Sequence, residues 1–192
     1  MEEPSLSTLD QVDMHYRTHI GDNVEYVRFQ APRMGILEWP RDSTRYGVHF
    51  YATLALHRLV LPAEESRHRF ELFTGVRIGD EAFRLAFAKM ANDVISDQMF
   101  LEGGHLVTPF DRTSSRHLRF GSWLMIERLD GFLPPLTLGS GDHVTFLDAT
   151  PVFKEEADLV RMRGTDALFE IWDEFDVRPS DLSRALPSHF SS

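Results

Sequence analysis

Apolar and polar residues alternate from residue 48 onward, and this alternation predicts the strand around which the fold is organised. Successive residues of a strand point to opposite faces, so the pattern assigns each residue to one of two faces. One face carries Val48, Phe50, Ala52, Leu54 and Leu56, and the other carries His49, Tyr51, Thr53, Ala55 and His57. We expect one long strand over residues 45–58, bent or bulged near Gly47 or Ala52 because straight strands of this length are unusual.

Other segments with the composition of strands are expected to pair around this one. They span residues 24–30, 67–74, 117–129 and 143–149, with an edge piece over 107–110. The segment 67–74 is expected to pair antiparallel with the long strand and to end at Gly75. Pro32 and Pro40 exclude a central strand from the loop between residues 31 and 44, and Pro151 is expected to end the last strand.

Apolar residues at helical spacing predict four helices, over residues 8–20, 79–94, 153–163 and 166–175. Ser7 or Thr8 can cap the first helix, and Gly164 suits the end of the third. The second helix carries a continuous apolar stripe of Phe83, Ala86, Phe87, Met90 and Val94.

The order of these elements predicts an α+β fold with a mixed, mainly antiparallel sheet flanked by helices. The strands cluster in the middle of the chain, and helices do not alternate regularly with them as they would in a parallel sheet. A chain of 192 residues is expected to form a single domain over residues 1–192. We expect its core to cover about residues 15–176, followed by a loose tail over 177–192.

The composition narrows the classes of function. The chain has 30 acidic and 20 basic residues, a formal net charge of −10, and no cysteine. This charge disfavours nucleic acid as a partner and favours basic proteins, although solubility alone explains it equally well. The lack of cysteine excludes disulfides, thiolate zinc sites and a cysteine nucleophile. Because the sequence has no signal peptide and no apolar run of membrane-spanning length, we expect a cytoplasmic protein with no membrane partner.

Patterns that would indicate catalysis or metal binding are weak. His49 and His57 lie about 26 Å apart along a straight strand, so they cannot share a zinc ion with His68 unless the strand bends sharply. Ser140 stands in a Gly-Ser-Gly-Asp turn and not in a nucleophile elbow, and no glycine-rich turn carries the lysine of a phosphate-binding loop. We therefore assign no catalytic, cofactor-binding or metal-binding residue.

Acidic residues cluster in the third helix and near the end of the fourth. Neighbouring residues of a helix do not face one another, so neither cluster forms an acid/base dyad. Each cluster is either a solvated helix face or an acidic patch for a basic partner, and the second interpretation requires exposed, unpaired carboxylates. Trp39 either helps to lock its loop or, if exposed, anchors an interface. The predicted partner-binding residues are Trp39, Glu155, Glu156, Asp158, Asp173 and Glu174.

Four stretches, taken together, resemble a known family. They read WPRDSTRYGVHFYAT over residues 39–53, HRFELFTG over 68–75, ATPVFKEEA over 149–157 and RGTDAL over 163–168. In order and spacing they resemble the Suppressor-of-fused-like domain in its bacterial form, from about residue 15 to about residue 176. The stretch 96–120 matches no part of that pattern.

The resemblance implies a compact domain that binds protein and has no catalytic residues or cofactor. In animals such a domain belongs to a regulator that holds a transcription factor and has a second, C-terminal domain, which a chain of this length is too short to contain. Many bacterial members are thought to be immunity proteins that neutralise toxins. We therefore expect an immunity protein of a toxin–antitoxin type of system, bound to a basic toxin domain. The alternatives are a regulatory or scaffold binder of a non-toxin protein, or a hydrolase, which a pocket joining His57, His68 and Glu71 would favour.

Overall fold

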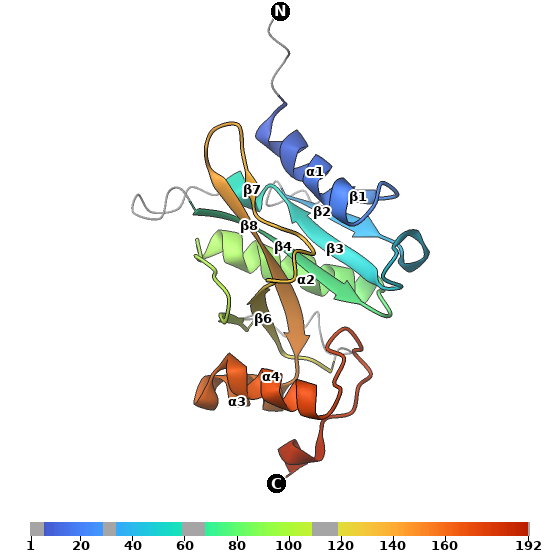
Figure 1. The fold of residues 1–192 in the computed structure, drawn as a ribbon, viewed down its shortest axis with the longest axis vertical. Helices are drawn as coiled ribbons and strands as arrows, with labels where there is room; N and C mark the ends of the chain where they lie inside the picture. The colour runs from blue at the N-terminus through green and yellow to red at the C-terminus, as the bar shows by residue number, and fades with distance from the viewer. Residues whose placement is uncertain (1–5, 29–33, 59–67, 109–118, 192) are drawn as a thin grey trace, which may run out of the picture.

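A computed structural model describes residues 6–28, 34–58, 68–108 and 119–191. These residues form four α-helices and one mixed, mostly antiparallel sheet of eight strands, which confirms the predicted α+β class (Figure 1). The helices are α1 (Thr8–His19), α2 (Glu81–Ser96), α3 (Lys154–Arg163) and α4 (Thr165–Glu174). The strands are β1 (Glu25–Arg28), β2 (Gly35–Trp39), β3 (His49–Leu54), β4 (His68–Val76), β5 (Leu106–Val107), β6 (Ser122–Glu127), β7 (Leu136–Thr137) and β8 (His143–Val152).

The sheet runs in the order β1-β2-β3-β4-β8-β6-β5, and β7 pairs with β8 outside this path. Strands β4 and β8 are parallel, with Glu71 opposite Phe146, and the other neighbouring pairs are antiparallel. A parallel pair needs a crossover connection, and here α2, β5, β6 and β7 all lie between the two strands in sequence. The central position of β4 and β8 agrees with their nearly continuous burial.

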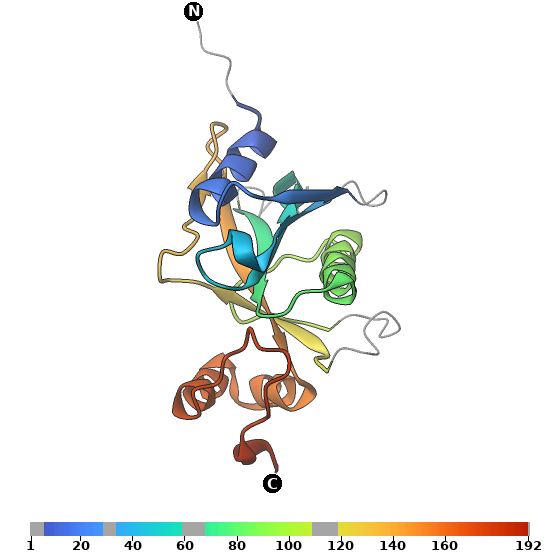
Figure 2. The same cartoon turned by 90° about the vertical axis from the view of Figure 1, so that its right-hand side faces the viewer.

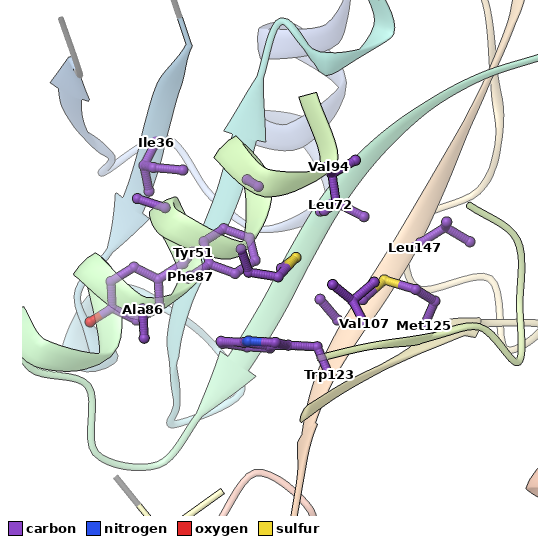
Figure 3. Packing of buried hydrophobic residues seen from close by; sticks show 14 of the residues in the cluster. Ile36, Tyr51, Leu72, Ala86, Phe87, Val94, Val107, Trp123, Met125 and Leu147 are labelled. Atoms are coloured by element: carbon purple, nitrogen blue, oxygen red, sulfur yellow. The ribbon is translucent and has the colours of Figure 1, made fainter. Parts of the chain in front are cut away.

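Helices cover both faces of the sheet, with α1 and α2 on opposite sides and α3 and α4 beyond one end (Figure 2). On one face of the sheet, the predicted apolar stripe of α2 packs against strands β2, β3, β4, β6 and β8. Figure 3 shows this packing, in which Phe87 and Val94 of the helix meet Tyr51, Leu72 and Trp123 of the sheet. Because the stripe faces a wide apolar sheet surface, α2 is the main support of this layer.

The opposite face of the sheet is shared between two helical units. Helix α1 buries Val12 and Tyr16 against β2, β3 and β8. Helices α3 and α4 form a separate cluster over Leu124 of β6 and Val152 of β8. This division leaves the part of the sheet between α1 and α4 with neither helix directly over it, and the cleft described below lies there.

The long strand predicted over residues 45–58 is shorter in the structure, and this part of the prediction is wrong. Gly47 has a positive φ of 64°, and β3 begins only at His49. The strand stops at Leu54 because Ala55 has a φ of 109°, and a single 3-10 turn follows over Leu56–Arg58. The amide N–H groups of Ala55 and His57 both donate to the Glu71 carboxylate, so a buried side chain holds this turn.

The structure also corrects the regions around the prolines. Strand β2 lies inside the predicted loop 31–44, because Pro40 follows the strand and removes no hydrogen bond from it. Strand β8 continues through Pro151 to Val152, since its pairing with β4 ends at Asp148 and only β6 pairs with it beyond that point. Strand β1 lies at one edge of the sheet and is mostly exposed.

The C-terminal segment, predicted as a loose tail over residues 177–192, packs against the rest of the molecule as far as the structure describes it. Leu182 and Leu186 contact the core under α2, and Val177 and Phe190 contact the α3–α4 cluster. Arg184 is buried, with its guanidinium 4.2 Å from the centre of the Phe153 ring. Residues 177–191 therefore contact both the core under α2 and the α3–α4 cluster.

Several expectations lie outside the described residues. They concern Pro32, the connection 59–66, the start of the strand predicted from residue 67, the end of the edge piece beyond Thr108, and the first residues of the strand predicted from 117. Within the described ranges, β6 covers only residues 122–127 of that last prediction.

Candidate partner-binding site

The six residues predicted to contact a partner fall into three groups in the structure. Glu155, Asp173 and Glu174 are exposed, and Asp158 is half-buried. Trp39 and Glu156 have no exposed surface at all. The expectation that all the carboxylates point into solvent is therefore wrong for Glu156, and an exposed Trp39 is excluded.

Trp39 belongs to the core under α1. It is the last residue of β2, its ring centre lies 5.9 Å from that of Tyr16, and its indole Nε1–H donates to the carbonyl of Gly21 at 2.7 Å. A buried indole needs a hydrogen-bond partner for its N–H, and the chain reversal at Gly21 supplies it. Trp39 thus locks α1 to the sheet.

Glu156 is an internal anchor of the C-terminal segment. Its Oε2 accepts from the backbone N–H of Phe153 at 2.7 Å and from Arg184 Nη2 at 2.7 Å, while its Oε1 accepts from Trp172 Nε1 at 3.0 Å. A buried carboxylate is tolerated when it is paired and hydrogen-bonded, and these contacts meet both conditions. Sequence reasoning grouped Glu156 with Glu155 because the two are adjacent in the sequence. Adjacent residues of a helix lie on different faces, so one is exposed and the other is buried.

The exposed carboxylates of α4 form a continuous stripe, which we call the α4 acidic face. It consists of Asp166, Glu170, Asp173 and Glu174. Their spacing of four, three and one residues places them on one side of a helix. No ion pair between residues that the structure describes involves any of them. By contrast, Asp158 of α3 contacts Lys154 at 2.7 Å and Arg161 at 2.8 Å, so its charge is locally compensated.

A cleft of about 710 Å³ lies on the α1 side of the sheet, between the end of α1 and α4. Its floor is made by Phe50 of β3, Gly75 of β4, and Asp148 and Thr150 of β8. Its walls include Tyr46, the loop after β6 from Arg128 to Phe132, Phe169 and Trp172 of α4, and Pro179. We call this feature the α1–α4 cleft.

Gly75 makes the floor of the cleft possible. A Cβ atom at this position would lie 2.9 Å from the Phe50 ring, so any side chain would push that ring aside. The Phe50 ring in turn stacks on Phe132 with their centres 5.4 Å apart, and Tyr46 meets Phe132 edge-on at 4.9 Å. The aromatic wall of the cleft therefore depends on a glycine in the neighbouring strand.

Asp148 and Arg128 place charge inside this largely aromatic cleft. Arg128 contacts Asp130, and its Nη1 lies 3.5 Å from Asp148 Oδ2. Burial raises the pKa of Asp148 to about 6, against the opposing effects of Arg128 and of the Thr150 hydroxyl. No pattern in the sequence marked these residues, because the cleft joins segments that are distant along the chain. The one local signal is the Asp130-Gly131 turn, where Gly131 has a φ of 73°.

The histidines do not meet in an open pocket. His57 Nδ1 lies 2.6 Å from Glu71 Oε1, but both side chains are buried, and neither lines a cleft found in the described part of the chain. Glu71 also accepts from the Thr53 hydroxyl at 2.5 Å. The side chain of His68 lies outside the described residues, and among those described no group of three or more His, Asp or Glu residues is placed to hold a metal ion.

A family model described as Suppressor of fused protein (SUFU) matches residues 23–185. Three solved structures are similar to this one. A SUFU homolog from Neisseria gonorrhoeae FA 1090 has a TM-score of 0.66 at 15% sequence identity, with 92% of this chain and 94% of that chain covered. The Sufu–Fu complex has a TM-score of 0.62 at 12% identity, with 93% and 89% covered. Drosophila Suppressor of Fused has a TM-score of 0.59 at 12% identity, with 86% and 46% covered.

At these identities the structural matches show the shared fold, and the assignment of the chain to a family rests on the family model. A comparison with curated protein sequences gives no match. In the described residues, none of the helices has the length and apolar character needed to cross a bilayer.

Proposed function

Because the chain belongs to the Suppressor of fused family, we propose that it is a non-catalytic protein-binding module, and that it serves as an immunity protein that neutralises a cognate bacterial toxin. A solved complex of a relative, Sufu with Fu, supports binding of protein as the kind of activity to expect. The net charge of −10 supports a basic partner.

The α4 acidic face is the observation that carries this proposal. Unpaired carboxylates on one helix side produce a local negative potential, which speeds encounter with a positive surface and selects against acidic partners. A toxin domain that cuts nucleic acid needs a positive surface for its own substrate. An acidic face that covers such a surface would block the toxin by occupying the site of its substrate.

A non-catalytic role also agrees with the placement of the buried polar groups. In the described part of the chain both side chains of the His57–Glu71 pair are buried, and the turn that follows β3 is bound to Glu71. A general base must reach the proton that it abstracts, and the hydrogen bond of this imidazole to another described residue goes to Glu71.

The second candidate is a regulatory or scaffold binder of a protein that is not a toxin. The Sufu–Fu complex favours it, because in that complex a member of the family binds a protein that is not described as a toxin. The two candidates differ in one respect that can be measured, which is whether the partner harms the cell when it is produced alone.

Co-expression with the protein encoded beside this chain tests the proposal. We expect that neighbour to stop growth alone and to become harmless when the chain is produced with it. The variant Asp173→Lys/Glu174→Lys should lose protection. The control Glu81→Lys/Asp97→Lys has the same charge change at exposed positions, the first residue and the C-cap of α2, and should keep it. A neighbour that is harmless alone and does not co-purify with the chain would refute the immunity role.

A further inference from the structure

We propose that the α1–α4 cleft receives a basic side chain, arginine or lysine, of the protein partner, and that Asp148 is its counter-ion. This inference rests on the proposed function only in assuming that the ligand is a protein. It adds a defined socket beside α4, the helix that carries the α4 acidic face, since Phe169 and Trp172 of α4 form one wall of the cleft.

The Asp148 carboxylate lacks the partners that a buried charge normally has. Its side chain is 15% exposed. Within the described residues, Oδ1 accepts from the Thr150 hydroxyl at 3.1 Å, and Oδ2 accepts from Arg128 Nη1 at 3.5 Å, the outer limit of a hydrogen bond. An ionised carboxylate can accept about four hydrogen bonds. Among the described residues, Asp148 therefore has acceptor sites that no protein donor fills.

Arg128 does not neutralise the charges around it. It is shared between Asp130 and Asp148, so neither carboxylate has this guanidinium to itself. Arg45, the other arginine of the cleft, lies with its guanidinium carbon 4.9 Å from the Tyr46 ring centre, and no ion pair between described residues joins it to either carboxylate. A guanidinium or ammonium group of a partner would give Asp148 a counter-ion of its own.

The walls of the cleft suit a cation with a long apolar stem. Tyr46, Phe50, Phe132, Phe169 and Trp172 line it. Faces of aromatic rings attract guanidinium and ammonium groups, and Phe132 already has the Arg128 guanidinium carbon 5.2 Å from its ring centre. The methylene groups of an arginine or lysine would pack on the same rings.

The rim of the cleft favours a protein over a small cation. Leu129 stands between Arg128 and Asp130 with 92% of its surface exposed, and Tyr46 is also exposed. Apolar side chains at the edge of a polar socket are typical of protein interaction sites. The occupant that fits is therefore a basic residue flanked by apolar residues in a segment of the partner.

Two blocked peptides test the socket directly. Acetyl-Leu-Arg-Leu-amide and the same peptide with citrulline, an uncharged residue of nearly the same shape, are titrated to about 10 mM into isotope-labelled protein and followed by NMR. We expect the arginine peptide to shift the amide signals of Phe132, Asp148 and Thr150, and to bind at least about tenfold more tightly than the citrulline peptide. Equal binding of both peptides, or no shift of these signals, would overturn the inference.

Variants of the cleft separate its charge from its shape. Asp148→Asn should weaken the arginine peptide at least about tenfold and leave the citrulline peptide unchanged, and Phe132→Leu should weaken both. Glu81→Gln, at an exposed position of α2 and outside the cleft, removes the same charge; it is the matched control and should alter neither affinity by more than about twofold. If Asp148→Asn retains the affinity of the unchanged protein for the arginine peptide, Asp148 is not the counter-ion.

The partner itself distinguishes failure of the socket from failure of the proposed function. If the neighbouring protein binds and Asp148→Asn does not weaken the complex, the inference falls while the proposed function stands. If that protein does not bind but the arginine peptide does so through Asp148, the socket stands and the partner must be sought elsewhere.

Discussion

Arg184 and Glu156 form a buried ion pair in which Nη2 and Oε2 lie 2.7 Å apart. The pair connects the C-terminal segment to the first turn of α3. Arg184 also donates to the carbonyl oxygens of Pro179, at 2.9 Å, and Pro151, at 3.1 Å. Glu156 accepts from Trp172, which also lines the α1–α4 cleft. The ion pair thereby supports the wall of the candidate binding site.

Removal of one partner of this pair should be costly. Arg184→Met keeps most of the side-chain length but leaves the Glu156 charge buried without its counter-ion, so we expect the free energy of unfolding to fall by about 3–5 kcal/mol. Urea titration measures the loss. The double variant Glu156→Gln/Arg184→Met should lose less than the sum of the two single variants. Arg178→Met, at an exposed position of the same segment, is the control, and an equal loss there would contradict the account.

Glu71 should be important for stability through its acceptor oxygens. Ala55, His57 and Thr53 all donate to this carboxylate, and Glu71→Ala would leave buried donors without partners. We expect this variant to lose about 3 kcal/mol or more of unfolding free energy. Glu71→Gln should lose clearly less, because its amide oxygen can still accept from the two backbone N–H groups. Equal losses for the two variants would show that the negative charge, and not hydrogen bonding, is what the turn needs.

Asp148 should make stability fall as the pH rises. Burial raises its pKa from 3.8 to about 6, so the folded protein binds this proton more tightly than the unfolded chain does. The folded state is therefore favoured at low pH, and this advantage disappears between about pH 4 and about pH 6. The full effect is on the order of 3 kcal/mol.

The variant Asp148→Asn isolates this effect because it does not titrate. Relative to the unchanged protein, it should gain unfolding free energy between about pH 4 and about pH 7.5. Chemical denaturation of both proteins at the two pH values measures the difference between their unfolding free energies. The contributions of the other carboxyl groups are the same in both proteins and cancel in this difference. A difference that is the same at both pH values, or that changes in the opposite direction, would contradict the assigned burial of Asp148.

The α4 acidic face should act mainly on the rate of association. Reversal of Asp173 and Glu174 to lysine should slow association with a basic partner by about tenfold or more at low salt, and should change dissociation less. The effect should shrink between about 50 mM and about 500 mM NaCl, because ions screen exposed charges. Stopped-flow kinetics measure both rates. If the association rate of the unchanged protein does not depend on salt, the electrostatic role of the α4 acidic face is contradicted.

The sequence predicts most of the fold where one local signal dominates. The apolar stripe from Phe83 to Val94 predicts α2 and its buried face, and Ser7 marks the start of α1. Local patterns fail where a distant residue decides the conformation. The break after Leu54 depends on Glu71, sixteen residues beyond Ala55, which accepts the N–H groups of the turn. Alternation in the sequence continues through that break, so it predicts a strand that does not form.

The candidate site is harder to predict for the same reason. Exposure of Glu155 and burial of Glu156 differ because Arg184, in a segment expected to be loose, reaches back to only one of the two. The α1–α4 cleft joins Tyr46, Arg128, Asp148 and Trp172 across more than a hundred residues of chain, and of these only Tyr46 lies in a stretch that resembles the family. The spacing of residues along the sequence indicates which of them share a face of a helix or strand, whereas a cleft depends on contacts between distant elements.

The most direct test of the account is the affinity between this protein and the product of the neighbouring gene, measured by isothermal titration calorimetry. The account predicts a complex with equal numbers of the two proteins that Asp173→Lys/Glu174→Lys weakens by about tenfold or more and that Glu81→Lys/Asp97→Lys leaves intact. A toxic neighbour that gives no binding heat and does not co-purify, or one whose complex is equally tight for both variants, would contradict it.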